Sequence, residues 1–252
     1  MTENARLRGI IEDAVRFFIR DYCERRRLEN IWRTPGVKYA DAEHPGFRDL
    51  KRIVLESHFM PEDFLPAPRT VISYFLPFAE SVAAGNVNGL RASDGWARAY
   101  NVTNEMAVHL NDHLVQAVND LGYRAAVPQN IGTLKDVLKS RWSQRHVARL
   151  AGHGTFGLNN MLITEQGCTG RFFSVIADLP LAHDAVVSGE RCLYRRNGTC
   201  GLCVARCPAE ALTPEGFDRW RCGEMCHKNE IEKGASVCGK CVVALPCSFR
   251  CP

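Results

Sequence analysis

The chain has 252 residues, of which 46% are hydrophobic and 24% charged, so its composition excludes a disordered protein and suits one or two globular domains. Its formal net charge of +4 is too small to indicate nucleic-acid binding by itself. No apolar run approaches the ~18–20 residues that cross a bilayer, and the first residues lack the apolar stretch of a secretory signal. We therefore predict a cytoplasmic protein with no membrane partner, for which nucleic acid is an unfavoured partner.

The first hundred residues alternate between helical and extended patterns. Apolar residues at helical spacing predict an amphipathic helix over 5–25. Five prolines and two glycines predict a loop over 33–68, with a short helix near 47–56. A β-branched and aromatic run predicts a buried strand over 70–78, and the Gly-, Asn- and Ser-rich stretch 85–95 predicts a mobile loop.

The next part of the chain continues this alternation. We predict a long helix over 97–121, a strand over 123–127 and a helix over 133–151. Two apolar runs, 158–164 and 171–177, predict strands that the intervening turn joins into a hairpin. The fold class predicted for residues 1–185 is therefore α/β (α+β), and residues 186–252 form a separate cysteine-rich domain.

The positions of the cysteines are the strongest chemical signal. Of twelve cysteines, only Cys23 and Cys168 precede residue 192. Disulfides are rare in the reducing cytoplasm, so ten crowded cysteines indicate thiolate ligands for a metal. For Cys23 and Cys168 we expect structural roles as ordinary thiols.

Two runs have the spacing of ferredoxin-type ligands. The first is Cys200-Gly-Leu-Cys203-Val-Ala-Arg-Cys207-Pro, which matches the last three cysteines of C-x-x-C-x-x-C-x-x-x-C-P. The missing first cysteine would fall at Asn197, and the nearby Cys192 can replace it. The second run is Cys238-Gly-Lys-Cys241, where the later cysteine has moved beyond a proline to Cys247.

In two-cluster ferredoxins the fourth cysteine of each run binds the other cluster. The same crossing predicts two ferredoxin-like [4Fe–4S] clusters in this chain. Cluster one takes Cys192, Cys200, Cys203 and Cys247, and cluster two takes Cys207, Cys222, Cys238 and Cys241. Cys226 and Cys251 are then left over, and either one is an alternative to an assigned ligand. Zinc held by two C-x-x-C pairs is the competing interpretation.

A glycine motif, Gly152-His-Gly154-Thr-Phe-Gly157, satisfies the G-x-G-x-x-G pattern. A dinucleotide site needs a strand before the motif and a helix after it, and here the predicted order is reversed. The motif therefore predicts a tight turn where backbone approaches something large and flat, or packs closely against the cysteine-rich domain.

Residues 142–157, 162–167 and 171–181, followed by the two cysteine runs, resemble the epoxyqueuosine reductase family, which is related to reductive dehalogenases. The resemblance extends from about residue 70 to the C-terminus. It implies a nitroreductase-like core that binds cobalamin, followed by a ferredoxin-type domain with two clusters. It also implies that an external low-potential donor sends electrons through the clusters to the corrinoid cobalt, which reduces a substrate.

The resemblance also implies candidate catalytic and cofactor-binding residues. The tRNA-modifying members carry a Gly-Arg-Asp-Tyr-His segment whose aspartate is thought to donate a proton, and that position falls near Asn101 here. Asparagine cannot donate that proton, whereas reductive dehalogenases use a tyrosine, so Tyr100 is the candidate acid. The alternative is that both residues only cap the helix. The nominated cofactor-binding residues are Arg145, His146, Gly152, Gly154, Gly157 and Arg171.

The predicted function is an iron–sulfur oxidoreductase acting through a corrinoid on an unidentified substrate. The second hypothesis is an electron-transfer or reductive-activation protein that passes electrons to another protein, such as a corrinoid protein. A third is a zinc-stabilised RNA-binding protein, which the small net charge disfavours.

Overall fold

A four-stranded antiparallel sheet organises the first part of the chain. The computed structural model describes residues 2–28 and 31–252. The sheet has the order β1 (Gly36–Asp41), β2 (Thr70–Pro77), β8 (Gly170–Ala177) and β3 (Ala125–Ala126). β2 is buried along its whole length, because it lies between two strands and has helices on both faces.

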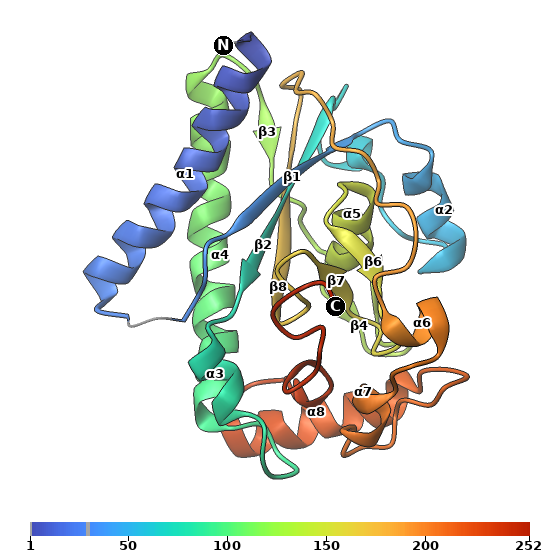
Figure 1. Cartoon of the computed structure of the whole chain (residues 1–252). Helices are drawn as coiled ribbons and strands as arrows, with labels where there is room; N and C mark the ends of the chain where they lie inside the picture. Colours follow the sequence, from blue (N-terminus) through green and yellow to red (C-terminus); the bar gives the residue numbers. More distant parts are fainter. Residues whose placement is uncertain (1, 29–30) are drawn as a thin grey trace.

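Helices cover the two faces of this sheet (Figure 1). α1 (Glu3–Arg26) and α4 (Asp94–Asp120) pack against the face that presents Ile72 and Tyr74. α2 (Gly46–Ile53) and α5 (Gln144–Leu150) pack against the opposite face, which presents Val71. Successive residues of a strand point to opposite faces, so β2 contributes to both cores. Each fully buried large apolar side chain stabilises the fold by ~1.5–3 kcal/mol.

The remaining elements are short. Two hairpins are formed by β4 (Thr133–Leu134) with β5 (Lys139–Ser140), and by β6 (Gly154–Phe156) with β7 (Leu162–Thr164). Helix α3 (Glu80–Gly85) precedes α4, and a 3₁₀ turn covers Pro61–Asp63. The cysteine-rich part contains α6 (Leu193–Asn197), α7 (Leu202–Ala205), α8 (Arg219–Lys233) and a 3₁₀ turn at Lys240–Val242. Figure 1 shows this part at one end of the sheet. None of the described helices is long and apolar enough to cross a membrane.

Most of the predicted elements are confirmed. The mixed α/β class is correct, with the strands antiparallel. The predicted helices over 5–25, 47–56 and 97–121 correspond to α1, α2 and α4, and the strand over 70–78 corresponds to β2. The region predicted as a loop over 33–68 also contains a strand, β1, which the sequence pattern did not predict. The domain boundary at 185/186 falls in an extended connection and remains a prediction.

The helix predicted over 133–151 is wrong in its first half. Residues 133–140 form the β4–β5 hairpin, and the helix begins only after Ser143. Ser140 stabilises the break, because its single hydroxyl proton has two acceptors within reach, the Ile131 and Trp142 carbonyl oxygens, 2.5 and 2.8 Å from Oγ. Its Oγ also accepts from the Trp142 amide, so a polar side chain satisfies backbone that a helix would otherwise pair.

The hairpin predicted between 158–164 and 171–177 is also wrong. β7 pairs with β6, whereas β8 pairs with β2 and β3. The intervening turn binds the C-terminal segment instead, through amides of Cys168 and Thr169 that donate to the Cys247 and Ser248 carbonyls at 2.9 and 3.2 Å. Gly167 permits this contact, since its φ is +86° and an added Cβ would lie 2.2 Å from the Ser248 carbonyl oxygen.

Candidate functional site: two cysteine pockets

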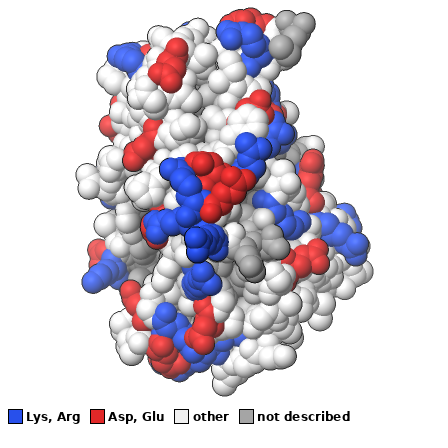
Figure 2. Space-filling model, turned by 90° about the vertical axis from the view of Figure 1, so that its left-hand side faces the viewer, with Lys and Arg blue, Asp and Glu red and all other residues white. Residues whose placement is uncertain are grey.

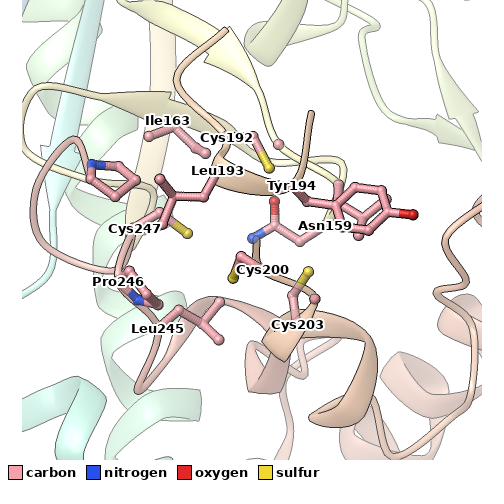
Figure 3. A pocket seen from close by; sticks show the side chains of 14 residues that line it. Asn159, Ile163, Cys192, Leu193, Tyr194, Cys200, Cys203, Leu245, Pro246 and Cys247 are labelled. Atoms are coloured by element: carbon pink, nitrogen blue, oxygen red, sulfur yellow. The ribbon is translucent and has the colours of Figure 1, made fainter. Parts of the chain in front are cut away.

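The first cysteine pocket collects thiols from distant parts of the chain. It is a hollow of about 360 Å³ bordered by all four cysteines predicted for cluster one. Figure 3 shows their sulfur atoms directed toward the same space. These cysteines are Cys192, Cys200, Cys203 and Cys247. Cys192 is the N-cap of α6 and Cys203 lies in α7. Cys247 arrives from the C-terminal segment that is bound to residues 168–169.

Apolar and amide side chains complete the first pocket. Ile163, Leu193 and Leu245 line it together with Asn159. Among the described residues that line it, no side chain is a lysine, arginine, aspartate or glutamate. Burial, and then the neighbouring thiols of Cys247, Cys192 and Cys200, raise the pKa of Cys203 to about 11. Nearby thiols resist joint ionisation, so a cation that binds here must displace protons.

The second cysteine pocket is larger, about 810 Å³, and holds five cysteines. Four of them are the residues predicted for cluster two, and the fifth is Cys226. The complete set is Cys207, Cys222, Cys226, Cys238 and Cys241. Burial, and then Cys222, Cys238 and Cys207, raise the pKa of Cys241. The structure therefore brings together both predicted sets, including the crossing of Cys207 and Cys247.

Cationic side chains surround the second pocket. Arg171 lines it, and the charge of Arg145 is close enough to Cys241 and Cys222 to affect ionisation there. Hydrogen bonding from Cys226 and the charge of Arg145 lower the pKa of Cys222 to about 7. Lys240 lies between Cys238 and Cys241, is 2% exposed, and donates through Nζ to the Asn86 and Asn88 carbonyls at 2.9 and 2.7 Å.

The two leftover cysteines behave differently. Cys226 lies one helical turn after Cys222 on α8 and shares its pocket, whereas Cys251 is exposed and lines neither pocket. The sequence signal for Cys226 was this i, i+4 spacing, which puts both thiols on one helix face. Outside both sets, Cys168 is buried, with its Sγ 3.9 Å from Cys247 Sγ. Among the described residues, no three His, Cys, Asp or Glu side chains converge on one metal-ion position.

The side chains of the two predicted catalytic residues, Tyr100 and Asn101, point to different places. Tyr100 lines the second pocket, and its ring centroid lies 4.3 Å from Arg171 Cζ. Burial lowers the pKa of Arg171, and Tyr100 partly opposes this effect. Asn101 is exposed and donates through Nδ2 to the Gly234 carbonyl at 3.0 Å, so it connects α4 to the end of α8 instead of facing the pocket.

The glycine motif serves the packing of the chain itself. A Cβ at Gly154 would lie 1.9 Å from the Ile163 carbonyl oxygen, and one at Gly152 would lie 2.4 Å from that of Ala185. The backbone that approaches these two glycines therefore belongs to β7 and to the connection before the cysteines. Gly157 borders the first pocket. Both neighbours lie within residues 1–185, so the close packing predicted against the cysteine-rich domain is not what Gly152 and Gly154 provide.

His146 anchors the same turn. Its Nδ1 lies 2.8 Å from Ser143 Oγ, and its ring centroid lies 4.6 Å from that of Phe156. Burial, followed by the charge of Arg145, lowers the pKa of His146 to about 4, so the imidazole is neutral near pH 7. Arg145 donates to the Asn160 carbonyl at 2.7 Å.

A further hollow of about 680 Å³ lies along α4 and β8 beyond the second pocket. Asn104, one turn after Tyr100, lines it, and so does Phe173, which is on the same strand face as Arg171. Residues 127–129, Ile131 and Gln144 also line it. Tyr100 and Arg171 thus line the second pocket, and each has a close neighbour along its own element, Asn104 or Phe173, that lines this groove.

Basic and acidic side chains mix on the α1 face. Figure 2 shows acidic and basic side chains beside one another on this face. Several of them pair, including Arg6 with Glu3 and Arg16 with Asp13, both at 2.7 Å.

Comparison with known proteins identifies the fold. Neither a protein-family model nor a curated protein sequence matches the chain. Solved structures of epoxyqueuosine reductases do match it. The enzyme from Streptococcus thermophilus has a TM-score of 0.58 and 16% identity over 93% of this chain and 68% of its own. The enzyme from Bacillus subtilis has a TM-score of 0.54 and 17% identity over 92% of this chain and 66% of its own.

The chain therefore has an epoxyqueuosine reductase-like fold, as the sequence resemblance implied, and spans about two thirds of the length of these proteins. Another matching structure, with a TM-score of 0.53 and 18% identity, is an epoxyqueuosine reductase with an epoxyqueuosine-modified tRNA stem loop.

Proposed function

We propose that the chain is an iron–sulfur oxidoreductase with a [4Fe–4S] cluster in each cysteine pocket. The observation that carries the proposal is the meeting of four thiols at one pocket and five at the other, with the two runs exchanging their last cysteines. Soft anionic thiolates are the ligands that such clusters require, and the crossing is typical of two-cluster ferredoxins. Four or five thiols around one hollow are enough ligands for a group with several metal atoms.

The ligands we propose are the two predicted sets: Cys192, Cys200, Cys203 and Cys247 in the first pocket, and Cys207, Cys222, Cys238 and Cys241 in the second. When bound, the clusters supply one-electron storage at low potential. Apolar side chains shield part of each pocket, Ile163 and Leu245 at the first and Phe78 and Val242 at the second.

We propose that the substrate lies in the groove along α4 and β8. Tyr100 is then the residue that holds a transferable proton between the second pocket and the groove. Arg171, whose Cζ lies 4.3 Å from the centroid of the Tyr100 ring, holds that ring in place beside the second pocket. Asn101 has no part in this step.

A corrinoid is a candidate occupant of the same groove. The amide side chains of Asn104, Asn111, Gln129 and Gln144 line it, and these donors and acceptors suit the amide-rich rim of a corrinoid. The floor is apolar, with Ala107 and Phe173. A bound corrinoid would supply a strongly reducing metal centre. Gly152 and Gly154, which the resemblance also nominated, have no part in this placement.

Two alternatives differ in what the groove receives. An electron-transfer protein without a small substrate would leave the groove free and pass electrons to a partner protein. A tRNA stem loop, which one protein of this fold binds, is the other candidate substrate class.

The test is anaerobic reconstitution with iron and sulfide. We expect about eight iron and eight sulfide per chain, with the visible and electron paramagnetic resonance spectra of [4Fe–4S] clusters. Stoichiometric zinc without sulfide would contradict the proposal. Titration of the reconstituted protein with cobalamin, and separately with a tRNA stem loop, then distinguishes the candidate occupants by absorption change and heat of binding.

A further inference from the structure

Trp96 has a buried indole N–H without a partner. Its side chain is 3% exposed, in the first turn of α4, and its Nε1 has no hydrogen-bond acceptor among the described residues. The other tryptophans differ. Trp32 donates to Thr103 at 2.8 Å, Trp142 donates to Ser174 at 3.0 Å, and Trp220 is 55% exposed. A buried donor without a partner costs ~1–3 kcal/mol, so this position calls for an acceptor.

The indole borders the second cysteine pocket. Trp96 lines it together with Cys238 and Cys241. Gly239, the residue that follows Cys238 in the turn, has φ +72°, and a Cβ there would lie 2.2 Å from ring carbons of Trp96 and 2.4 Å from Nε1. The indole edge that carries the N–H therefore lies directly against the backbone of the ligand turn.

Neighbouring groups fix the indole in this position. The Phe78 ring contacts it edge to face, with centroids 5.2 Å apart. The α4 N-cap, Ser93, accepts the Trp96 backbone amide at 3.2 Å and donates its own amide to Asn86 at 2.9 Å. Asn86 in turn donates to the Cys238 carbonyl at 2.9 Å. The helix start that carries Trp96 is thus tied to the loop that carries the ligands.

We propose that the Trp96 indole N–H donates a hydrogen bond to a sulfur of the cluster in the second pocket and raises its reduction potential. This inference rests on the proposed function. On reduction the cluster gains one electron from an external reductant, and its sulfurs become more negative. A donor therefore binds the reduced form more strongly than the oxidised form, which shifts the equilibrium toward reduction.

The test is a redox titration with dithionite, monitored by electron paramagnetic resonance, on reconstituted Trp96→Phe protein. Phenylalanine keeps an aromatic ring beside Phe78 and Gly239 but lacks the N–H. We expect the second cluster to become about tenfold harder to reduce, which corresponds to ~59 mV for a one-electron couple. The first cluster should keep its potential. Trp220→Phe, which removes an exposed N–H, is the matched control and should change neither potential.

A second measurement needs no substitution. Protein labelled with ¹⁵N at the tryptophan indoles should show one ¹⁵N coupling to the reduced second cluster, together with an exchangeable proton that deuterium replaces. Both signals should disappear in Trp96→Phe.

The outcomes separate the two proposals. A wild-type protein that binds no second cluster contradicts the proposed function. A protein with both clusters but no indole ¹⁵N coupling overturns the role of Trp96, even if Trp96→Phe does not retain its cluster. An unchanged potential in a Trp96→Phe protein that retains both clusters also overturns it.

Discussion

The two cysteine pockets offer similar ligands in different electrostatic surroundings. The first is bordered by Ile163, Leu193, Leu245 and the Asn159 amide, without a lysine or arginine among its described lining residues. The second has Arg171 in its wall, Arg145 close to two of its cysteines and Lys240 buried inside the ligand turn. Positive charge favours a reduced, more anionic cluster, so we expect the second pocket to have the higher potential. Electrons would then move from the first pocket toward the groove beside Tyr100.

The crossing of ligands is the prediction with the largest effect. Cys207→Ser should remove about half of the iron and abolish the signal of the second cluster, although Cys207 belongs to the first run. Cys247→Ser should remove the other half and the first signal, as should Cys192→Ser, because these residues line the other pocket. Iron analysis and electron paramagnetic resonance measure both effects. If Cys207→Ser instead abolishes the first signal, the two runs do not cross.

The glycines at equivalent positions of the two C-x-x-C turns have different surroundings. Gly201 and Gly239 each follow the first cysteine of a C-x-x-C pair. A Cβ at Gly201 would meet nothing within 4 Å, whereas one at Gly239 would overlap Trp96 and take φ +72°. We expect Gly239→Ala to lower the free energy of unfolding by about 2–4 kcal/mol and to loosen the second cluster, with Gly201→Ala within ~0.5 kcal/mol of wild type. Thermal and denaturant unfolding of both variants measure this difference, and equal losses would refute it.

The next residues of the two pairs, Leu202 and Lys240, also differ. Lys240 is buried and holds two backbone carbonyls of the 86–88 loop, whereas Leu202 is 50% exposed. Lys240→Leu should lower the potential of the second cluster, because it removes a buried positive charge. It should also cost ~1–3 kcal/mol for each carbonyl left without a donor. Leu202→Lys, which adds an exposed charge at the first pocket, should change its potential far less. Redox titration of both variants checks the order of these effects.

The smallest effect concerns the leftover thiols. Cys251→Ala should keep all of the iron, since Cys251 is exposed and borders neither pocket. Cys226→Ala should also keep it, because the four proposed ligands of the second pocket, Cys207, Cys222, Cys238 and Cys241, all remain. Iron content is the measurement. Loss of half of the iron in Cys226→Ala would make Cys226 a ligand in place of Cys222.

Local spacing explains how far the sequence predicted this site. The C-x-x-C turns are short stretches of chain, and the pattern of two-cluster ferredoxins supplies the crossing, so the cysteine spacing is enough to predict which thiols line each pocket. Trp96 and Lys240 could not be assigned in this way, because their roles arise from the packing of α4 and the 86–88 loop against a segment about 150 residues later.

The predicted elements of the fold divide in the same way, into those that follow from local patterns and those that depend on long-range contacts. α1, α4 and β2 follow from long periodic patterns. The 133–140 hairpin depends on the side-chain bonds of Ser140, and the turn after β7 depends on the distant C-terminal segment. Gly154 illustrates the limit most clearly: its pattern suggested an approach to a ligand, and the neighbour is the Ile163 backbone.

The exchange of Cys207 and Cys247 between pockets also has a consequence for biosynthesis. A ribosome releases the cysteines in chain order, and Cys241, the last proposed ligand of the second pocket, emerges before Cys247. The first pocket contains the earliest of these cysteines, Cys192, and yet its last cysteine, Cys247, follows the last cysteine of the second pocket. A chain cut between residues 241 and 247 would keep every cysteine of the second pocket and lose one of the four proposed ligands of the first.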